Sequence, residues 1–464
     1  MIELPLWTFW ILVAISASSV LHYFLIPSVR WFFRRKVNRM IRHLNSSLSI
    51  EIPPFKLTKR QSLVDSLICD PEVLDAAHQK AKDENIPIES ILPQVKKYAK
   101  EIVPSFNVYF YFRVGYWLAK TISQSLFRVR LGYIDEESLK KVDPNSSVVF
   151  VINHRSNMDY ILVSYFVATR TAISYAVGEW ARIWPLQTLI KSMGAYFVRR
   201  SSGNTLYRKV LERYIQTATH AGVTQAVFLE GRLSRDGHLN PPKFGILDYL
   251  VRKYSPDDSK DIVLIPVGIN YDRTLEDRTL LRSREKEGKK GKVKIAGLTF
   301  TLLFKNFFLH LRGKLFRYGY ACVNFGTPIS LKEYTQSQNL NFLRMDKEER
   351  FKTMETFGAY LMDRIGEIIP VLPVSLVSKV LVDHQEEPLS ELELKVRVQK
   401  MMEKLTDDGV HVYIPRHDMD YAISVGLRML KLRRLVNENE GLFLLNPKEV
   451  EIVKYYSNSL AHYF

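Results

Sequence analysis

His154 and Asp159 have the residue types and spacing of an acid–base pair, within the stretch "VINHRSNMDYILVSYF" (151–166). An aspartate that accepts a hydrogen bond from one ring nitrogen of a histidine fixes the tautomer and leaves the other nitrogen free as a base. Such a histidine can deprotonate a hydroxyl and contributes ~10²–10⁴-fold to a rate. The same spacing also fits a surface pair or a helix cap, so both interpretations stay open at this point.

The geometry of this stretch requires a strand followed by a turn. Two residues five positions apart on a helix lie ~140° apart around its axis, so the pair cannot share one helix face. We predict a strand over "SVVFVIN" that ends at Asn153, with His154 in the turn that follows. Ser156 or Asn157 then caps the next helix, and Asp159 lies in its first turn, where the helix dipole favours a carboxylate.

Further polar residues end the neighbouring predicted strands, in "GAYFVRRSSGN", "VFLEGRLSRDG" and "IPVGINYDR". Strand ends converge on one crevice in an open α/β sheet, so we expect these groups to face His154. Guanidinium groups can bind phosphate through two hydrogen bonds, and a glycine allows close approach of the backbone. The pattern predicts a basic pocket for a phosphorylated alcohol, built from Arg199, Arg200, Glu230, Gly231, Arg232, Ser234, Arg235, Lys243 and Pro266.

The elements that must position these residues form an α/β pattern. From about residue 146, short β-rich runs alternate with helical stretches, which predicts a mixed, largely parallel central sheet flanked by helices. We expect four parts: a transmembrane anchor (1–29), a helical N-terminal region (30–125), the α/β domain (126–385) and a helical C-terminal region with a possible β-hairpin (386–464). The C-terminal part also resembles a winged helix, although it lacks a distinct basic recognition helix.

The N-terminus predicts a membrane protein. No charged residue lies between Glu3 and Arg30, and six basic residues follow between positions 30 and 42. This asymmetry predicts one uncleaved span in the cell inner (cytoplasmic) membrane, with the rest of the chain in the cytoplasm; a buried hydrophobic helix is the alternative. Segment 106–133 is aromatic and basic, and it fits either a helix on a membrane surface or a helix packed against the main domain. Segment 278–311 has a basic first half, and it fits either attraction to anionic lipid or a solvated basic loop.

Composition and missing motifs restrict the function further. The formal net charge of +17 favours a phosphate-bearing partner: nucleic acid, anionic lipid or a phosphorylated substrate. The sequence has no nucleophile elbow, zinc-protease motif, Walker loop or dinucleotide fingerprint, which argues against serine hydrolases and nucleotide-dependent enzymes. Cys69 and Cys322 lack metal-type spacing, and we expect both to be reduced core thiols.

The segments "NHRSNMDY", "GAYFVRRSSGN", "FLEGRLSRDG" and "IPVGINYDR", in this order, resemble the four motifs of the glycerolipid acyltransferases. The likeness points to the bacterial membrane glycerol-3-phosphate acyltransferases and their relatives that act on dihydroxyacetone phosphate. It extends over roughly residues 55–464, through "YAKEIVPSFN", "VNFGTPISL", "VLPVSLVS" and "YYSNSLAHYF". Relative to the larger bacterial members, we expect an N-terminal extension and a region beyond "YYSNSLAHYF" to be missing.

The resemblance implies a role for each motif. His154 would take the proton of the glycerol hydroxyl, which attacks an acyl thioester directly, and Asp159 would orient His154. Arg200, Glu230, Gly231, Ser234 and Arg235 match positions that shape the acceptor site, and Pro266 matches the fourth motif. The implied partners are glycerol 3-phosphate, acyl-CoA or acyl-carrier-protein, and membrane phospholipid, with no cofactor, metal or nucleic acid.

One departure from the family pattern concerns the third motif. After Glu-Gly the family usually has Gly or Thr and then Arg, whereas this chain has Arg232 and then Leu233. In an extended segment, a shift of one residue turns a side chain to the opposite face. Lysophosphatidate and dihydroxyacetone phosphate therefore stay open as alternative acceptors. Two other classes of function also stay open: an inactive membrane scaffold and a basic nucleic-acid-binding protein.

Overall fold

The computed structural model describes residues 50–178, 182, 186–199, 203–257, 259–285 and 317–464, and the single helical positions Trp7, Trp10, Val13 and Ser16. The chain divides into two units, Met1–Glu51 and Ile52–Phe464. Apart from these four positions, the predicted transmembrane anchor lies outside the described residues, as does most of the basic segment 278–311. Within the described ranges, no helix is both long and apolar enough to cross a bilayer.

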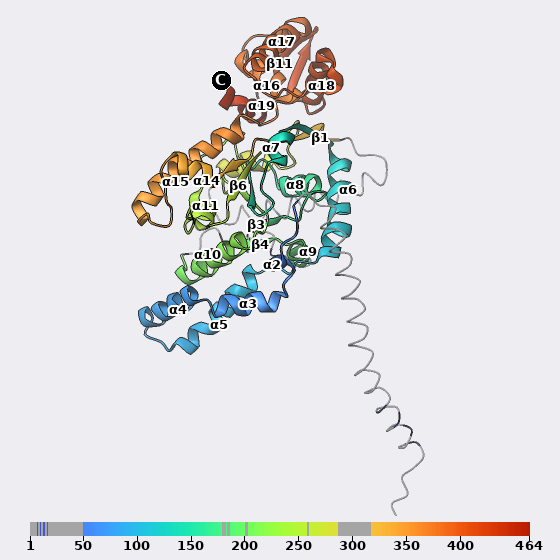
Figure 1. Ribbon diagram of the computed structural model, residues 1–464. Coiled ribbons are helices and arrows are strands. Elements are labelled where there is room, and N and C mark those ends of the chain that lie inside the picture. The colour runs from blue at the N-terminus through green and yellow to red at the C-terminus, as the bar shows by residue number, and fades with distance from the viewer. Residues whose placement is uncertain are drawn as a thin grey trace, which may run out of the picture. The chain divides into compact units, whose positions relative to one another are not determined.

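A mixed, largely parallel sheet forms the centre of the second unit, as predicted (Figure 1). Strands β2, β3, β4, β5 and β6 run parallel to their neighbours, whereas β7 and the short β8 pair with β6 in the antiparallel sense. In the described chain the order is β1-β7-β6-β2-β5-β3-β4. The strands are β1 (Arg128–Ile134), β2 (Ser147–Ile152), β3 (Ser174–Gly178), β4 (Tyr196–Val198), β5 (Gln225–Phe228), β6 (Ile262–Tyr271), β7 (Tyr320–Phe325) and β8 (Ile329–Ser330).

Every residue of β2, β5 and β6 is buried, because helices cover both faces of this sheet. These are α8 (Asp159–Val167), α9 (Leu186–Ser192), α10 (Thr205–His220), α11 (Phe244–Val251), α14 (Leu331–Ser337) and α15 (Lys347–Gly366). A further helix, α12 (Asp277–Glu285), packs against the C-terminal core through Leu280. The chain reaches β1 through the π-helix η1 (Phe110–Gly115) and α6 (Tyr116–Leu126), and the short α7 (Glu136–Lys140) joins β1 to β2. The continuous apolar runs that predicted the strands are explained by this two-sided burial.

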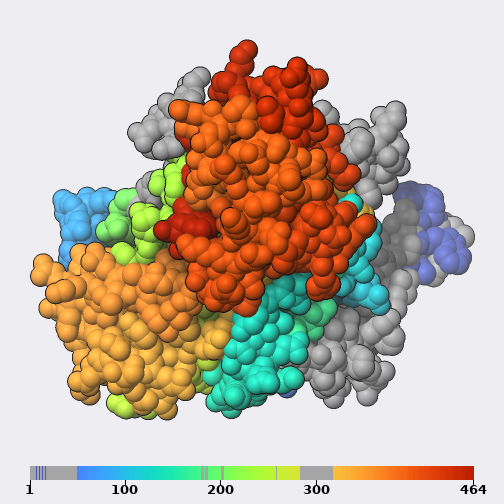
Figure 2. All heavy atoms as spheres, turned by 90° about the horizontal axis from the view of Figure 1, so that it is seen from above, coloured from blue at the N-terminus to red at the C-terminus, as the bar shows by residue number. Residues whose placement is uncertain are grey.

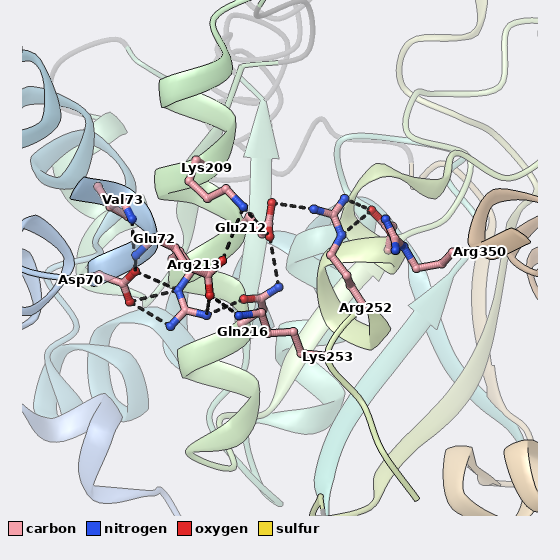
Figure 3. A network of polar contacts seen from close by, with 11 residues as sticks. Asp70, Glu72, Val73, Lys209, Glu212, Arg213, Gln216, Arg252, Lys253 and Arg350 are labelled. Carbon is pink, nitrogen blue, oxygen red and sulfur yellow. Dashed lines mark hydrogen bonds and ion pairs between the residues drawn. The ribbon is translucent and has the colours of Figure 1, made fainter. Parts of the chain in front are cut away.

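Among the N-terminal helices, the start of α4 is joined to the α/β core by a network of ion pairs (Figure 3). These helices are α2 (Pro54–Leu57), α3 (Arg60–Ile68), α4 (Pro71–Asp83) and α5 (Ile88–Ile102). Asp70 caps α4 by accepting from the amides of Glu72 and Val73, and it also accepts from the guanidinium of Arg213 on α10, at 2.8–3.0 Å. One carboxylate thus starts a helix and joins it to the core. Cys69, next to this cap, is exposed, so the prediction of a core thiol is wrong for Cys69, whereas Cys322 is buried.

The C-terminal residues gather into one lobe with its own hydrophobic core (Figure 2). Its elements are α16 (Pro373–Asp383), β9 (Leu389–Ser390), α17 (Glu391–Asp407), η3 (Pro415–His417), α18 (Met419–Leu432), β10 (Val436–Asn439), β11 (Leu442–Leu445), α19 (Val450–Ser457) and η4 (Asn458–Tyr463). A two-residue turn, Glu440-Gly441, joins β10 to β11, and both residues have positive φ (51° and 79°). Such a turn matches the twist of a hairpin, and glycine adopts positive φ without steric cost.

Candidate active site

The turn that carries His154 begins where β2 stops pairing. The side-chain amide of Asn153 donates to the carbonyl of Ile269 at 2.9 Å and accepts from its N–H at 2.8 Å. This pair of bonds continues the ladder between β2 and β6 for one more position, through a side chain in place of the backbone. His154 therefore leaves the sheet at a fixed point, as the sequence predicted for the end of this strand.

The structure brings His154 and Asp159 together. Nδ1 of His154 lies 2.9 Å from Oδ2 of Asp159, and the two residues are 2% and 0% exposed. Since Nδ1 is engaged by the carboxylate, the nitrogen that stays available as a base is Nε2. The imidazole also packs 4.1 Å from the ring of Phe228 at the end of β5, measured between centroids. The ring is thus held by one hydrogen bond and by aromatic packing.

Asp159 is an acceptor for the whole turn. Its Oδ2 accepts from the backbone amides of Arg155 and Ser156 at 2.7 and 3.0 Å, and its Oδ1 accepts from the hydroxyl of Tyr271 at 2.6 Å. Burial and the negative charge of Asp159 raise the pKa of Tyr271 well above its ordinary value, so this phenol stays a donor. These bonds hold the carboxylate in place, with Oδ2 directed at the imidazole.

The predicted helix cap is wrong. Helix α8 begins at Asp159 itself, and its N-cap residue, Met158, makes no side-chain cap. Asp159 takes over the task because its carboxylate reaches back to the amides three and four residues earlier. Ser156 and Asn157 turn instead toward Glu276, which accepts from the Ser156 hydroxyl at 2.7 Å and from the Asn157 side chain at 3.2 Å.

Glu230 and Ser234 contact the backbone of His154. Oε1 of Glu230 accepts from the N–H of His154 at 2.7 Å, and the N–H of Ser234 donates to the carbonyl of His154 at 2.9 Å. Oε2 of Glu230 accepts from the side chain of Asn240 at 2.6 Å, and burial raises the pKa of this carboxyl. Both residues are fully buried, so they fix the histidine in position.

The basic residues around Gly231 are more accessible to solvent than Glu230 and Ser234 of the same loop. Gly231 has φ +65°, and a Cβ at this position would lie 2.9 Å from Cγ of Lys243. Arg232 and Lys243 are exposed and Arg235 is half-buried. Within the described ranges none of these three cations forms an ion pair. Leu233, which stands where the family pattern has arginine, packs against the core of the C-terminal lobe.

Arg199, Arg200 and Pro266 have no described contact with His154. Arg199 forms two hydrogen bonds with Glu101 of α5, at 2.8 and 2.6 Å, and stacks on Tyr207. Arg200 lies outside the described residues. Pro266 sits in the middle of β6, where it lines a hollow of about 570 Å³ whose lining does not include His154. Of the residues predicted to share one crevice with His154, Glu230 and Ser234 lie against it. Arg199 and Pro266 are instead engaged at other places in the fold.

Sequence inspection missed several residues of the site. Tyr271 ends β6 and Glu276 follows it, so the criterion used for the other motifs, polar residues at strand ends, would have found them. Arg155 is buried and donates to the carbonyl of Gly237, which no spacing rule predicts. In the described part of the chain no cluster of His, Cys, Asp or Glu has the arrangement of a metal site.

Comparisons with known proteins place this geometry in context. The family model described as the glycerol-3-phosphate acyltransferase C-terminal region matches residues 304–464, and the model described as acyltransferase matches residues 133–270. The chain is 28% identical over 447 residues to a glycerol-3-phosphate acyltransferase of Pseudomonas fluorescens, across 93% of this chain and 51% of that protein. It is also 28% identical over 448 residues to that of Pseudomonas putida, across 93% and 52%.

The chain thus spans about half the length of the curated relatives that it matches. Among solved structures, the 1-acyl-sn-glycerophosphate acyltransferase of Thermotoga maritima is similar with a TM-score of 0.31 and 17% identity. That match covers 55% of this chain and 77% of the Thermotoga chain.

Proposed function

Because the chain belongs to the glycerol-3-phosphate acyltransferase family, within the glycerolipid acyltransferase superfamily, we propose that it acylates glycerol 3-phosphate. The acyl group comes from acyl-CoA or acyl-carrier-protein, the sn-1 hydroxyl accepts it, and the product is lysophosphatidate for phospholipid synthesis. The observation that carries this proposal is the buried His154–Asp159 pair, with Nδ1 on the carboxylate and Nε2 left for the substrate.

The geometry supports a direct transfer. Nε2 of His154 takes the proton of the sn-1 hydroxyl while that oxygen attacks the thioester carbonyl carbon. Asp159 stabilises the imidazolium that forms, because it faces Nδ1–H at 2.9 Å. The tetrahedral intermediate then expels the thiolate, and the imidazolium returns the proton to the sulfur. No residue becomes acylated, and His154 ends as it began.

The basic residues around Gly231 would bind the phosphate of the acceptor. Arg232, Arg235 and Lys243 carry charges that no described carboxylate neutralises, and they belong to the loop whose Glu230 holds His154. Arg200 would join them, whereas Arg199 would act through Glu101 to fix the end of β4. Pro266 would shape the strand that carries Tyr271, without touching the acceptor.

We also propose attachment to the cytoplasmic membrane through residues 1–29, with the catalytic domain in the cytoplasm. A stripe along η1 and α6 supports a membrane-facing surface: Tyr109 and Trp117 are each 57% exposed, and Arg113 and Lys120 are exposed between and beyond them. The opposite side of the same segment is buried. Aromatic rings and cations on one helical face suit the headgroup region of an anionic bilayer.

Acyl transfer by the full chain in detergent tests the proposed reaction. Labelled acyl-CoA or acyl-carrier-protein is offered with glycerol 3-phosphate, dihydroxyacetone phosphate or lysophosphatidate. His154→Ala should lose about 10²–10⁴-fold in rate, whereas His220→Ala, at an exposed position at the end of α10, should keep full activity. Undiminished transfer by His154→Ala would refute the base.

The same assay decides between acceptors and function classes. Leu233 at the usual arginine position favours a test of all three acceptors, since the arginine of the third motif is displaced by one residue, to Arg232. A preference for lysophosphatidate or dihydroxyacetone phosphate would move the function within the family. No transfer with any donor and acceptor would indicate a membrane scaffold. Protease accessibility in membrane vesicles tests the location of the catalytic domain.

A further inference from the structure

The turn from His154 to Asn157 lies between two buried carboxylates. Asp159 binds it from α8, and Glu276, between β6 and α12, binds it from the other side. Ser156 joins the two, because its N–H donates to Asp159 at 3.0 Å and its hydroxyl donates to Glu276 at 2.7 Å. Glu276 also accepts from the backbone N–H of Asn157 at 3.3 Å and is 2% exposed.

We propose that Glu276 is a positioning residue for proton transfer, which holds this turn and adds a second negative charge beside the Asp159–His154 pair. The proposal rests on the acyl transfer proposed above, because it concerns how strongly His154 attracts the substrate proton. Glu276 acts through Ser156 and Asp159, and its hydrogen bonds to the turn are made with Ser156 and Asn157.

The electrostatic part follows from how Asp159 is used. Its carboxylate accepts from the imidazole, two backbone amides and Tyr271, so its charge is shared among several donors. An ionised Glu276 adds negative potential without competing for Nδ1 of His154. This potential stabilises the imidazolium more than the neutral imidazole, and it therefore strengthens the base.

The charge on Glu276 changes in the neutral pH range. Burial raises its pKa to about 7, with a further increase from Asp159 and an opposing decrease from the hydrogen bond of Ser156. The other titratable groups that face it are Tyr271 of β6 and Tyr455 of α19, whose pKa values burial raises, so both stay neutral. The nearby cation is Arg155, whose charge acts on Tyr455. Protonation of Glu276 should thus weaken His154 as the pH falls.

The test compares kcat/KM for glycerol 3-phosphate against pH in three variants of the full chain. Glu276→Gln keeps an acceptor for Ser156 but removes the charge, Glu276→Asp keeps the charge, and Glu449→Gln removes the partner of the exposed Arg278 as a matched control. In Glu276→Gln we expect the acid limb to move by about half to one unit toward lower pH. We expect kcat to fall by about three- to tenfold, with KM within about twofold. Glu276→Asp should retain the acid limb, and Glu449→Gln should match the wild type.

A purely structural role would lower activity without moving the acid limb, and that result would overturn the electrostatic part. Hydrogen–deuterium exchange of the peptide over 154–160 supplies a readout that needs no activity: Glu276→Gln should exchange faster there than Glu449→Gln. Unchanged exchange would refute the positioning of the turn. If the wild type transfers no acyl group while exchange still increases, the proposed function fails and the positioning role survives. If the wild type is active and both readouts are unchanged, only Glu276 fails.

Discussion

Replacement of Tyr271 by Phe removes a single hydrogen bond from the carboxylate of Asp159. The phenol donates to Oδ1 of Asp159 at 2.6 Å, and the other three bonds of this carboxylate go to Oδ2. Tyr271 is 1% exposed and Asp159 0%, so water cannot replace the lost donor. A hydrogen bond to a charged group contributes about 1.5–3 kcal/mol, and Phe fills nearly the same volume. We therefore expect the free energy of unfolding to fall by about 2–3 kcal/mol.

The same change should strengthen the base. Without the phenol, the charge of Asp159 is less dispersed and attracts the proton on Nδ1 of His154 more strongly. The acid limb of kcat/KM should therefore move to higher pH, opposite to the direction expected for Glu276→Gln, by up to about one unit. Opposite signs from two buried neighbours of Asp159 would be difficult to explain by general loosening of the fold.

Tyr254→Phe provides a matched control for the stability measurement. The Tyr254 hydroxyl is buried, and within the described part of the chain it has no hydrogen-bond partner, so its removal should cost little. Urea unfolding of the full chain in detergent, followed by intrinsic fluorescence, compares the two variants with the wild type. Equal losses in Tyr271→Phe and Tyr254→Phe would refute the bond to Asp159 as a stabilising contact.

Three further predictions concern the network, the loop and the pH dependence of stability. Arg213→Met removes the ion-pair partner of Asp70 (Figure 3), and the free energy of unfolding in urea should fall by about 1–3 kcal/mol. Solvent screening at this partly exposed site makes the loss smaller than for a fully buried pair. An unchanged unfolding midpoint would refute the network as a stabilising contact. Gly231→Ala should lower the free energy of unfolding by about 1–2 kcal/mol, because φ is +65° and the new Cβ meets Lys243; equal stability would show that the loop adjusts freely. Burial raises the pKa of Asp272 from 3.8 to about 6, so the folded state binds more protons than the unfolded state between these values. The free energy of unfolding should therefore fall as pH rises through this window, and Asp272→Asn should reduce this slope in unfolding measured at several pH values; an undiminished slope would exclude Asp272 as its source.

Much of the scaffold could be predicted from local patterns. Strands buried on both faces are continuous apolar runs, and β2, β5 and β6 match the predicted segments because each has this character. The placement of Asp159 in the first turn of a helix was likewise confirmed. In both cases the signal lies within a few residues of the structure it specifies.

Other features depend on partners that are distant in sequence. Arg199 is bound by Glu101, 98 residues earlier, which no local motif indicates. The cap of α8 was wrongly predicted because Glu276, 120 residues after Ser156, attracts the residues that resembled caps. Long-range contacts of this kind decide which polar residues support the fold and which remain available to a ligand.

Leu233 illustrates how these two groups of residues are separated within one loop. Glu230 and Ser234 are buried against the backbone of His154, whereas Arg232 is exposed. Because Leu233 packs against the C-terminal core, an arginine restored at this position would have to bury a charge or displace the loop. The shift of arginine to position 232 therefore moves the cation to the open side while the support of the base is retained. Changes in acceptor recognition should thus arise from Arg232 and Lys243, and changes in the strength of the base from the buried carboxylates.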